Sequence, residues 1–113
     1  MITIYHKPGC ITSQRVLNML RDSGKRFRVV HYMEHPLDED ALIQLLEKLN
    51  IPAEQLLRTK EKVWSEKYAG KKMNTAQIIR AIADNPVLMQ RPVLVKRTRA
   101  ILARPPEIAA AWI

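Results

Sequence analysis

The stretch ITIYHKPGCITS, residues 2–13, decides the fold. Its first four residues alternate between apolar and polar side chains, as they do in a half-buried strand. A turn with Pro8 and Gly9 follows, and a helical spacing of apolar residues then runs from about residues 10–12 to Ser23-Gly24. Residues 27–33 form a second β-type run. Strand, helix and strand in this order predict a right-handed βαβ unit with parallel strands.

The middle of the chain predicts helices, and its end predicts two strands and a last helix. We expect helices over residues 38–50, from Pro52 onward and over 74–85, strands over 92–96 and 100–103, and a helix over 105–112. The whole pattern predicts an α/β fold with a thioredoxin-like mixed four-stranded sheet (βαβ … ββα) and an inserted helical subdomain at roughly residues 36–86. A length of 113 residues predicts a single domain, 1–113.

Cysteine count and hydropathy exclude several classes of protein. The chain has one cysteine, Cys10, which excludes an internal disulfide framework and any multi-cysteine zinc or iron–sulfur site. The longest apolar run, residues 108–113, is far too short to span a membrane, and the N-terminus lacks the pattern of a secretory signal. We therefore expect a cytoplasmic protein with a reduced thiol, no bound cofactor, no metal and no membrane partner.

The net charge of +8 is unevenly distributed along the sequence, because residues 53–113 carry +7 of it. Such a field can attract nucleic acid, an acidic protein surface or a small anion, although most charges of this kind are simply solvated. Direct nucleic-acid binding is the weakest of these hypotheses. The sequence shows no helix-turn-helix, zinc-finger spacing or aromatic RNA-binding motif.

Cys10 stands where the turn leads into a helix N-terminus, a position at which free N–H groups and the helix dipole favour a thiolate. A buried structural cysteine is the alternative, but a turn–helix junction is exposed. The hydroxyl of Ser13 can point back at the sulfur or at an anion beside it, and His6 is close enough to contribute charge or a proton. Cys10 to Ser13 is a Cys-x-x-Cys motif with its second cysteine replaced. The protein must therefore form a mixed disulfide with an outside thiol, most simply glutathione.

The segment from His6 to Ser13, together with Arg58, Arg91-Pro92 and Arg104-Pro105, resembles the glutaredoxin-coupled arsenate reductases of bacteria over essentially the whole chain. The resemblance implies that Cys10 attacks arsenate, that glutathione is the co-substrate, and that glutaredoxin clears the Cys10–glutathione disulfide. It also implies roles for further residues. The implied oxyanion-binding arginines are Arg58, Arg91 and Arg104, and the implied supporting residues are His6, Ser13 and Pro92, the last after a cis peptide bond.

Two alternatives remain open at this level. The chain has Lys7-Pro8 before the cysteine segment and Gln14 after Ser13, where family members commonly have Asn-Pro and Arg, so a relative with another acceptor is one alternative. The other is an Spx-type transcription regulator, which shares this fold and insertion and binds RNA polymerase. Those regulators typically carry Cys-x-x-Cys, and the serine at position 13 favours the enzyme.

Overall fold

The computed structural model describes all 113 residues as an α/β protein of four strands and seven helical segments. Contacts divide the chain into two compact units, Met1–His35 with Arg91–Ile113, and Pro36–Gln90. The elements of the first unit are β1 (Ile2–His6), α1 (Ile11–Ser23), β2 (Phe27–His31), β3 (Val93–Lys96), β4 (Arg99–Leu102) and α6 (Glu107–Trp112). Those of the second unit are α2 (Glu39–Leu49), α3 (Ala53–Leu56), α4 (Lys62–Lys67), α5 (Thr75–Asp84) and the 3₁₀ helix η1 (Pro86–Leu88).

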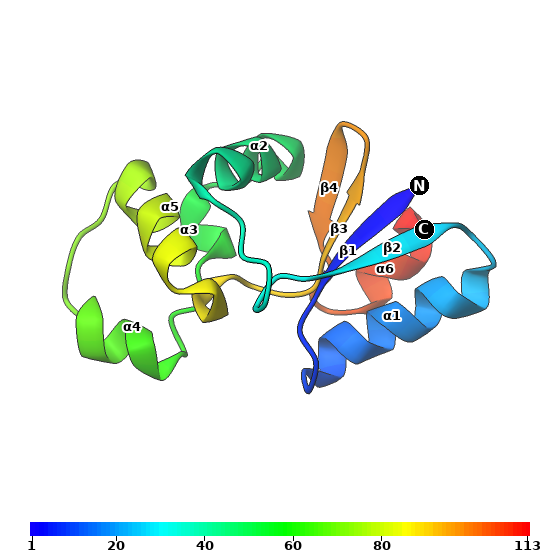
Figure 1. Cartoon of the computed structure of the whole chain (residues 1–113), viewed down its shortest axis with the longest axis horizontal. Coiled ribbons are helices and arrows are strands. Elements are labelled where there is room, and N and C mark those ends of the chain that lie inside the picture. The colour runs from blue at the N-terminus through cyan, green and yellow to red at the C-terminus, as the bar shows by residue number, and fades with distance from the viewer. The chain divides into compact units, whose positions relative to one another are not determined.

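The first unit is a mixed four-stranded sheet in the order β2-β1-β3-β4 (Figure 1). β1 pairs with β2 in parallel and with β3 in antiparallel, and β3 and β4 form an antiparallel hairpin. The predicted βαβ … ββα order, the mixed sheet and the helical insertion are therefore confirmed. The residues of this insertion, expected at roughly 36–86, lie in the second unit, Pro36–Gln90.

The core of the first unit lies between the sheet and the two helices α1 and α6. Burial alternates along β1, so that Ile2 and Ile4 are buried while Thr3 and Tyr5 are partly exposed. The core residues are Ile2, Ile4, Val16, Leu17, Leu20, Leu94, Ala103 and Ala109. This packing anchors β1 and α1, and with them the turn between these elements.

The expected helix boundaries agree with the structure where a capping residue defines them. Gly24 ends α1 in the left-handed conformation at φ 72°. Asp38 caps α2 by accepting from the N–H of Ala41, and Asn74 and Gln77 form a reciprocal capping box at the start of α5.

Other expectations need correction. β2 ends at His31 rather than at residue 33, because the next residues turn back with the N–H groups of Glu34 and His35 donating to the His31 oxygen. The β3–β4 turn has two residues, not three: β4 begins at Arg99 and ends at Leu102, and Arg97 takes the turn at φ 42°. The last helix begins at Glu107, after Pro106. α4 and η1 were not expected.

No helix combines the length and the apolar character that a membrane span requires.

Candidate active site

A turn connects β1 to α1 (Figure 1). Cys10 is the N-cap residue of α1. Its backbone is extended, its N–H donates to the oxygen of Lys7 at 3.2 Å, and its own oxygen accepts from Gln14 at 2.9 Å. Gly9 precedes it at φ 84°, a conformation that a residue with a Cβ adopts only with strain. The first turn of α1 contains no acidic residue. The thiol is therefore held, half-buried, at a helix N-terminus that carries no competing negative charge.

Three groups lower the pKa of the Cys10 thiol. Burial acts in the opposite direction and raises it. A hydrogen bond from the main-chain N–H of Ser13, a hydrogen bond from the Arg91 side chain, and the positive charges of Arg91 and Arg104 more than offset burial. The net pKa of Cys10 lies below its usual value, so the thiolate fraction is larger than that of an ordinary cysteine at the same pH.

Arg91 and Arg104 reach the thiol from the open end of the β3–β4 hairpin, where β3 begins and β4 ends. Arg91 precedes β3, follows directly on the second unit and is 7% exposed. Arg104 follows β4, and its Nη1 donates to the main-chain oxygen of Arg91 at 2.9 Å. The peptide bonds Arg91–Pro92 and Arg104–Pro105 are both cis, the first as the family resemblance implied. The hairpin thus brings together two guanidinium groups that are 13 positions apart in the sequence.

Ser13 acts through its main chain rather than its hydroxyl, contrary to the expectation that the hydroxyl points at the sulfur or at an anion. The fully buried Ser13 Oγ lies 2.6 Å from Nδ1 of His6 and accepts from the N–H of Lys7 at 3.2 Å. The hydroxyl therefore ties the end of β1 to the first turn of α1, while the N–H is directed to the sulfur.

His6 is 3% exposed, and its ring meets that of His31 edge-on at 5.8 Å between centroids. Burial first, and then the charges of His31 and Arg21, lower the pKa of His6. His6 is therefore neutral at neutral pH and supports the turn through Ser13. A neutral His6 adds no positive charge beside the Cys10 thiol, so the expected contribution of charge is not supported.

Arg58 lies in the second unit, just after α3. Its main-chain N–H donates to the main-chain oxygen of Leu88 at 2.7 Å. This bond lies next to an antiparallel β-bridge between Leu57 and Met89, and it fixes the backbone there. The side chain is mostly buried, with Nε 3.7 Å from a carboxylate oxygen of Glu61 and Nη1 donating to Gln90 Oε1 at 3.4 Å. The first unit thus gathers Cys10, His6, Ser13, Arg91 and Arg104, whereas Arg58 is held separately in the second.

Gln90 is a residue that sequence reasoning missed. It holds Arg58 through Oε1, and its Nε2 donates to the main-chain oxygen of Leu57 at 3.3 Å. The one feature of the sequence that could have indicated Gln90 is its position directly before Arg91. Its partner Arg58 is 32 positions away in the sequence. Only the folded chain reveals that contact.

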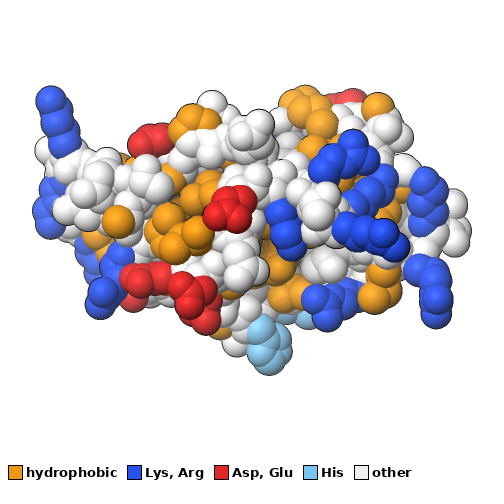
Figure 2. Space-filling view, turned by 90° about the horizontal axis from the view of Figure 1, so that it is seen from above, with side chains coloured by type: hydrophobic (Ala, Val, Ile, Leu, Met, Phe, Trp, Pro, Cys, Tyr) orange, Lys and Arg blue, Asp and Glu red, His pale blue; other side chains and the backbone are white.

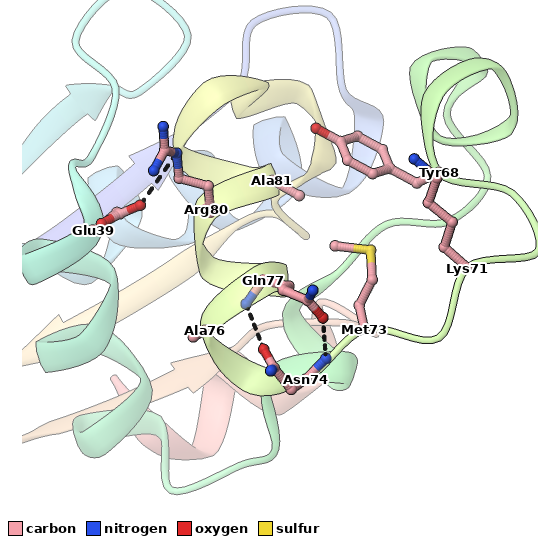
Figure 3. Close-up of a pocket in the computed structure, with 9 residues that line it drawn as sticks. All are labelled: Glu39, Tyr68, Lys71, Met73, Asn74, Ala76, Gln77, Arg80 and Ala81. Atoms are coloured by element: carbon pink, nitrogen blue, oxygen red, sulfur yellow. Dashed lines mark hydrogen bonds and ion pairs between the residues drawn. The ribbon is translucent and has the colours of Figure 1, made fainter.

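The second unit contains a separate hollow of about 520 Å³ between the segment after α4 and helix α5 (Figure 3). Its polar groups already pair with one another. Arg80 contacts Glu39 at 3.5 Å and Asp84 at 3.4 Å, Asn74 and Gln77 cap each other, and Lys71 lies over the Tyr68 ring at 6.0 Å. The chain has no cluster of three side chains suited to a metal ion.

Comparison with known proteins gives matches over almost the whole chain. The sequence profile of the ArsC family matches residues 5–111. An uncharacterized protein of Escherichia coli K12, YfgD, is 39% identical over 108 residues, covering 94% of this chain and 91% of that protein. An arsenate reductase of the same organism is 35% identical over 108 residues, covering 95% of this chain and 77% of the enzyme. Among solved structures, an arsenate reductase from Vibrio cholerae superposes with a TM-score of 0.92 at 28% identity, covering 99% of this chain and 97% of that one.

Proposed function

This chain is a member of the ArsC family, and we propose that it reduces arsenate to arsenite through Cys10, with glutathione and glutaredoxin as reductants. The observation that carries the proposal is the lowered pKa of a thiol held by the Ser13 N–H and two guanidinium groups. A nucleophilic thiolate beside paired arginines suits a tetrahedral oxyanion, because guanidinium forks bind such oxygens in pairs.

The reaction begins with binding of the anion. Arg91 and Arg104 neutralise the oxygens of arsenate beside the sulfur, and the family resemblance implies a third guanidinium, that of Arg58. The Cys10 thiolate attacks arsenic and forms a sulfur–arsenic bond, while one arsenate oxygen takes up protons and leaves as water. The N–H of Ser13 and the N-terminus of α1 hold the sulfur in line for this attack.

The reduction step uses a second thiol. The glutathione sulfur attacks Cys10, the sulfur–arsenic bond breaks, and its electron pair remains on arsenic, which passes from As(V) to As(III) and leaves as arsenite. The two sulfurs are oxidised to the Cys10–glutathione disulfide. Because the chain has no second cysteine, a glutaredoxin thiolate must attack the glutathione sulfur to release Cys10. These reductants act in the cytoplasm, where a lone thiol stays reduced, and we place the enzyme there.

The test is NADPH oxidation in a mixture of this protein, glutathione, glutaredoxin and glutathione reductase, with and without arsenate. We expect an arsenate-dependent rate that disappears in Cys10→Ser and persists in Ser65→Ala, a control on the exposed helix α4. Glutathionylation of Cys10 without an arsenate-dependent rate would leave the thiol chemistry intact and point to another acceptor. Specific retention of RNA polymerase in that case would favour the regulator.

A further inference from the structure

The fold concentrates the positive charge of the protein in one of its two units. Residues 1–35 and 91–113 carry eleven Lys and Arg and three Asp and Glu, a net charge of +8, whereas residues 36–90 carry eight of each and are neutral. The sequence alone had placed the excess in residues 53–113, because the last strands and helix join the N-terminal segment only in the folded chain. The two active-site arginines of this unit account for a small part of its excess.

Many of the remaining cations lie at the end of the sheet opposite Cys10. Ile2 pairs with Phe27 on one side and with Lys96 on the other, and Lys96 pairs with Arg99. These paired residues lie at one end of the sheet, which also carries four exposed arginines. We call these four arginines the basal patch: Arg26, Arg28, Arg97 and Arg99. Figure 2 looks onto this end and shows Lys and Arg side chains gathered on it with few acidic groups among them.

The basal patch has no carboxylate partners of its own. The four ion pairs of the protein, those of Arg58, Lys62 and Arg80, all lie within residues 36–90. Of the four patch arginines, Arg28 donates to a neutral hydroxyl, that of Thr3, at 3.4 Å. The neighbouring Lys25 and Lys96 contact main-chain oxygens of Ile113 and Trp112. Like charges held this close raise the local potential and favour binding of an extended anion.

The same end of the unit is hollowed. A recess of about 550 Å³ lies among Met1, Ile2, Gly24, Lys25, Arg26, Lys96 and Arg97. Its floor is apolar, and Met1 is 75% exposed beside it. A phosphate backbone has no group that fills an apolar recess, whereas a protein segment offers both carboxylates and apolar side chains. The combination of cationic rim and apolar floor therefore favours a protein partner.

We propose that the basal patch binds an acidic segment of a partner protein, with one apolar side chain in the recess and carboxylates on the surrounding arginines. Arg pairs with carboxylate in a two-point geometry, which gives such a site orientation as well as charge attraction. Cys10 and Gly24 cap opposite ends of α1, a helix of 13 residues and about 20 Å in length. A partner at the basal patch therefore leaves the thiol accessible. The proposal does not depend on the identity of the acceptor of Cys10.

The test uses a defined probe, the fluorescein-labelled peptide EEDLDEE, and a matched peptide in which serine replaces the central leucine. Binding is followed by fluorescence anisotropy at physiological salt. The patch variant is Arg26→Glu with Arg97→Glu, and the control is Lys60→Glu with Lys72→Glu, which makes the same change in net charge in the second unit. We expect the patch variant to lose at least tenfold in affinity and the control to lose less than threefold. The leucine peptide should bind more tightly than the serine peptide.

Equal losses in both variants would overturn the proposal, because net charge alone would then explain binding. Equal affinity for the two peptides would also overturn it, since the recess would have no role. Tighter binding of oligo-dT, or of phosphatidylserine vesicles, that the patch variant abolishes would assign the surface to another class of partner. Circular dichroism checks the fold, and the single variant Arg99→Glu provides a milder disturbance with the same expected direction.

Thiol accessibility gives an independent readout. The rate of Cys10 alkylation by iodoacetamide should be the same with and without saturating peptide, and a slowed rate would place the peptide at the active site instead. The patch variant should keep the full arsenate-dependent rate. Failure of the reductase assay in the unmodified protein would thus leave the peptide result standing, so the two proposals fail separately.

Discussion

The Nη1 atom of Arg104 donates a hydrogen bond to the main-chain oxygen of Arg91 at 2.9 Å. The two residues flank the open end of the β3–β4 hairpin, Arg91 before β3 and Arg104 after β4, so this bond fixes one guanidinium against the backbone of the residue that carries the other. Both charges lower the pKa of Cys10, with the Arg91 contributions larger than that of Arg104. Arg104 therefore acts on the thiol by charge and on Arg91 by contact.

Replacing Arg104 by alanine should raise the pKa of Cys10, because one of the charges that favour the thiolate is lost. The thiolate absorbance at 240 nm, followed against pH, measures this shift directly. Arg104→Lys should restore most of the pKa effect but not arsenate affinity, because an ammonium lacks the planar fork. Lys72→Ala, on the surface of the second unit, is the control. An unchanged thiol titration in Arg104→Ala would contradict the assigned role.

Ser13→Ala should lower stability more than it changes the thiol. The buried hydroxyl bonds with His6 Nδ1 and accepts from the Lys7 N–H, and its removal leaves buried polar groups without partners, at about 1–3 kcal/mol. The Ser13 N–H that serves Cys10 belongs to the main chain and stays. Urea unfolding measures the first effect and the 240 nm titration the second. Ser65→Ala, whose hydroxyl donates on an exposed helix, should cost far less. A large rise in thiol pKa with unchanged stability would show that the hydroxyl serves the sulfur after all.

Much of the fold could be predicted from the sequence because the signals that define its elements are local. The apolar alternation in residues 2–5, the Gly24 stop and the caps at Asp38 and Asn74 each depend on neighbours within one turn. α4 was missed because none of its residues is buried, so it lacks the apolar stripe that marks a helix. Its Trp64 stacks on Tyr68 at 5.5 Å instead.

The sequence could predict which residues belong to the candidate site, but not how these residues contact one another. Position at a helix start identified Cys10, and the family pattern supplied the arginines. The direction of the Ser13 hydroxyl could not be predicted, because it depends on how β1 and α1 lie against each other. The contact of Gln90 with Arg58 and the pooling of charge in one unit arise from residues far apart in the sequence. Spacing patterns carry no information on such pairs.

Gln90→Ala should weaken arsenate binding by releasing Arg58. The amide holds Nη1 of Arg58 and is itself fixed by the Leu57 oxygen, so its loss frees the guanidinium to adopt other rotamers. One such hydrogen bond corresponds to about 0.5–1.5 kcal/mol, which is about a 2- to 10-fold rise in KM. Because Arg58 would bind substrate and transition state alike, kcat should change less than KM. Gln44→Ala, on the exposed face of α2, is the control, and an equal KM in both variants would remove Gln90 from the site.

Glu61→Gln should act in the opposite direction. The Glu61 carboxylate lies 3.7 Å from Nε of Arg58 and competes with any anion for that guanidinium. The partly exposed pair is worth little, so a fall in the arsenate KM of about 2- to 5-fold is expected. Glu66→Gln breaks the pair with Lys62 on α4 and should leave KM unchanged. A rise in KM in Glu61→Gln would mean that the carboxylate orients Arg58 rather than competing for it.

The burial of His6 predicts a loss of stability in mild acid. Because the folded state lowers the pKa of His6 below 6.5, the unfolded chain binds more protons between that lowered pKa and 6.5. The stability conferred by neutral His6 is therefore complete above about pH 6.5 and falls as the pH drops through this window. One such group contributes a slope of at most about 1.4 kcal/mol per pH unit. Urea unfolding between pH 7.5 and pH 5 measures the slope.

Comparison of His6→Gln with His35→Asn isolates the effect. Glutamine cannot titrate, so the first variant should start less stable at pH 7.5 and lose less on acidification than the unmodified protein. His35 lies at an exposed position, and its replacement serves as the control. The His6 ring meets that of His31 edge-on, and the charges of His31 and Arg21 both lower the pKa of His6. His31→Gln should therefore also reduce the loss of stability on acidification, though less than His6→Gln. If all variants lost stability in parallel with the unmodified protein, carboxylates rather than His6 would govern the acid response, and the buried imidazole would have no part in it.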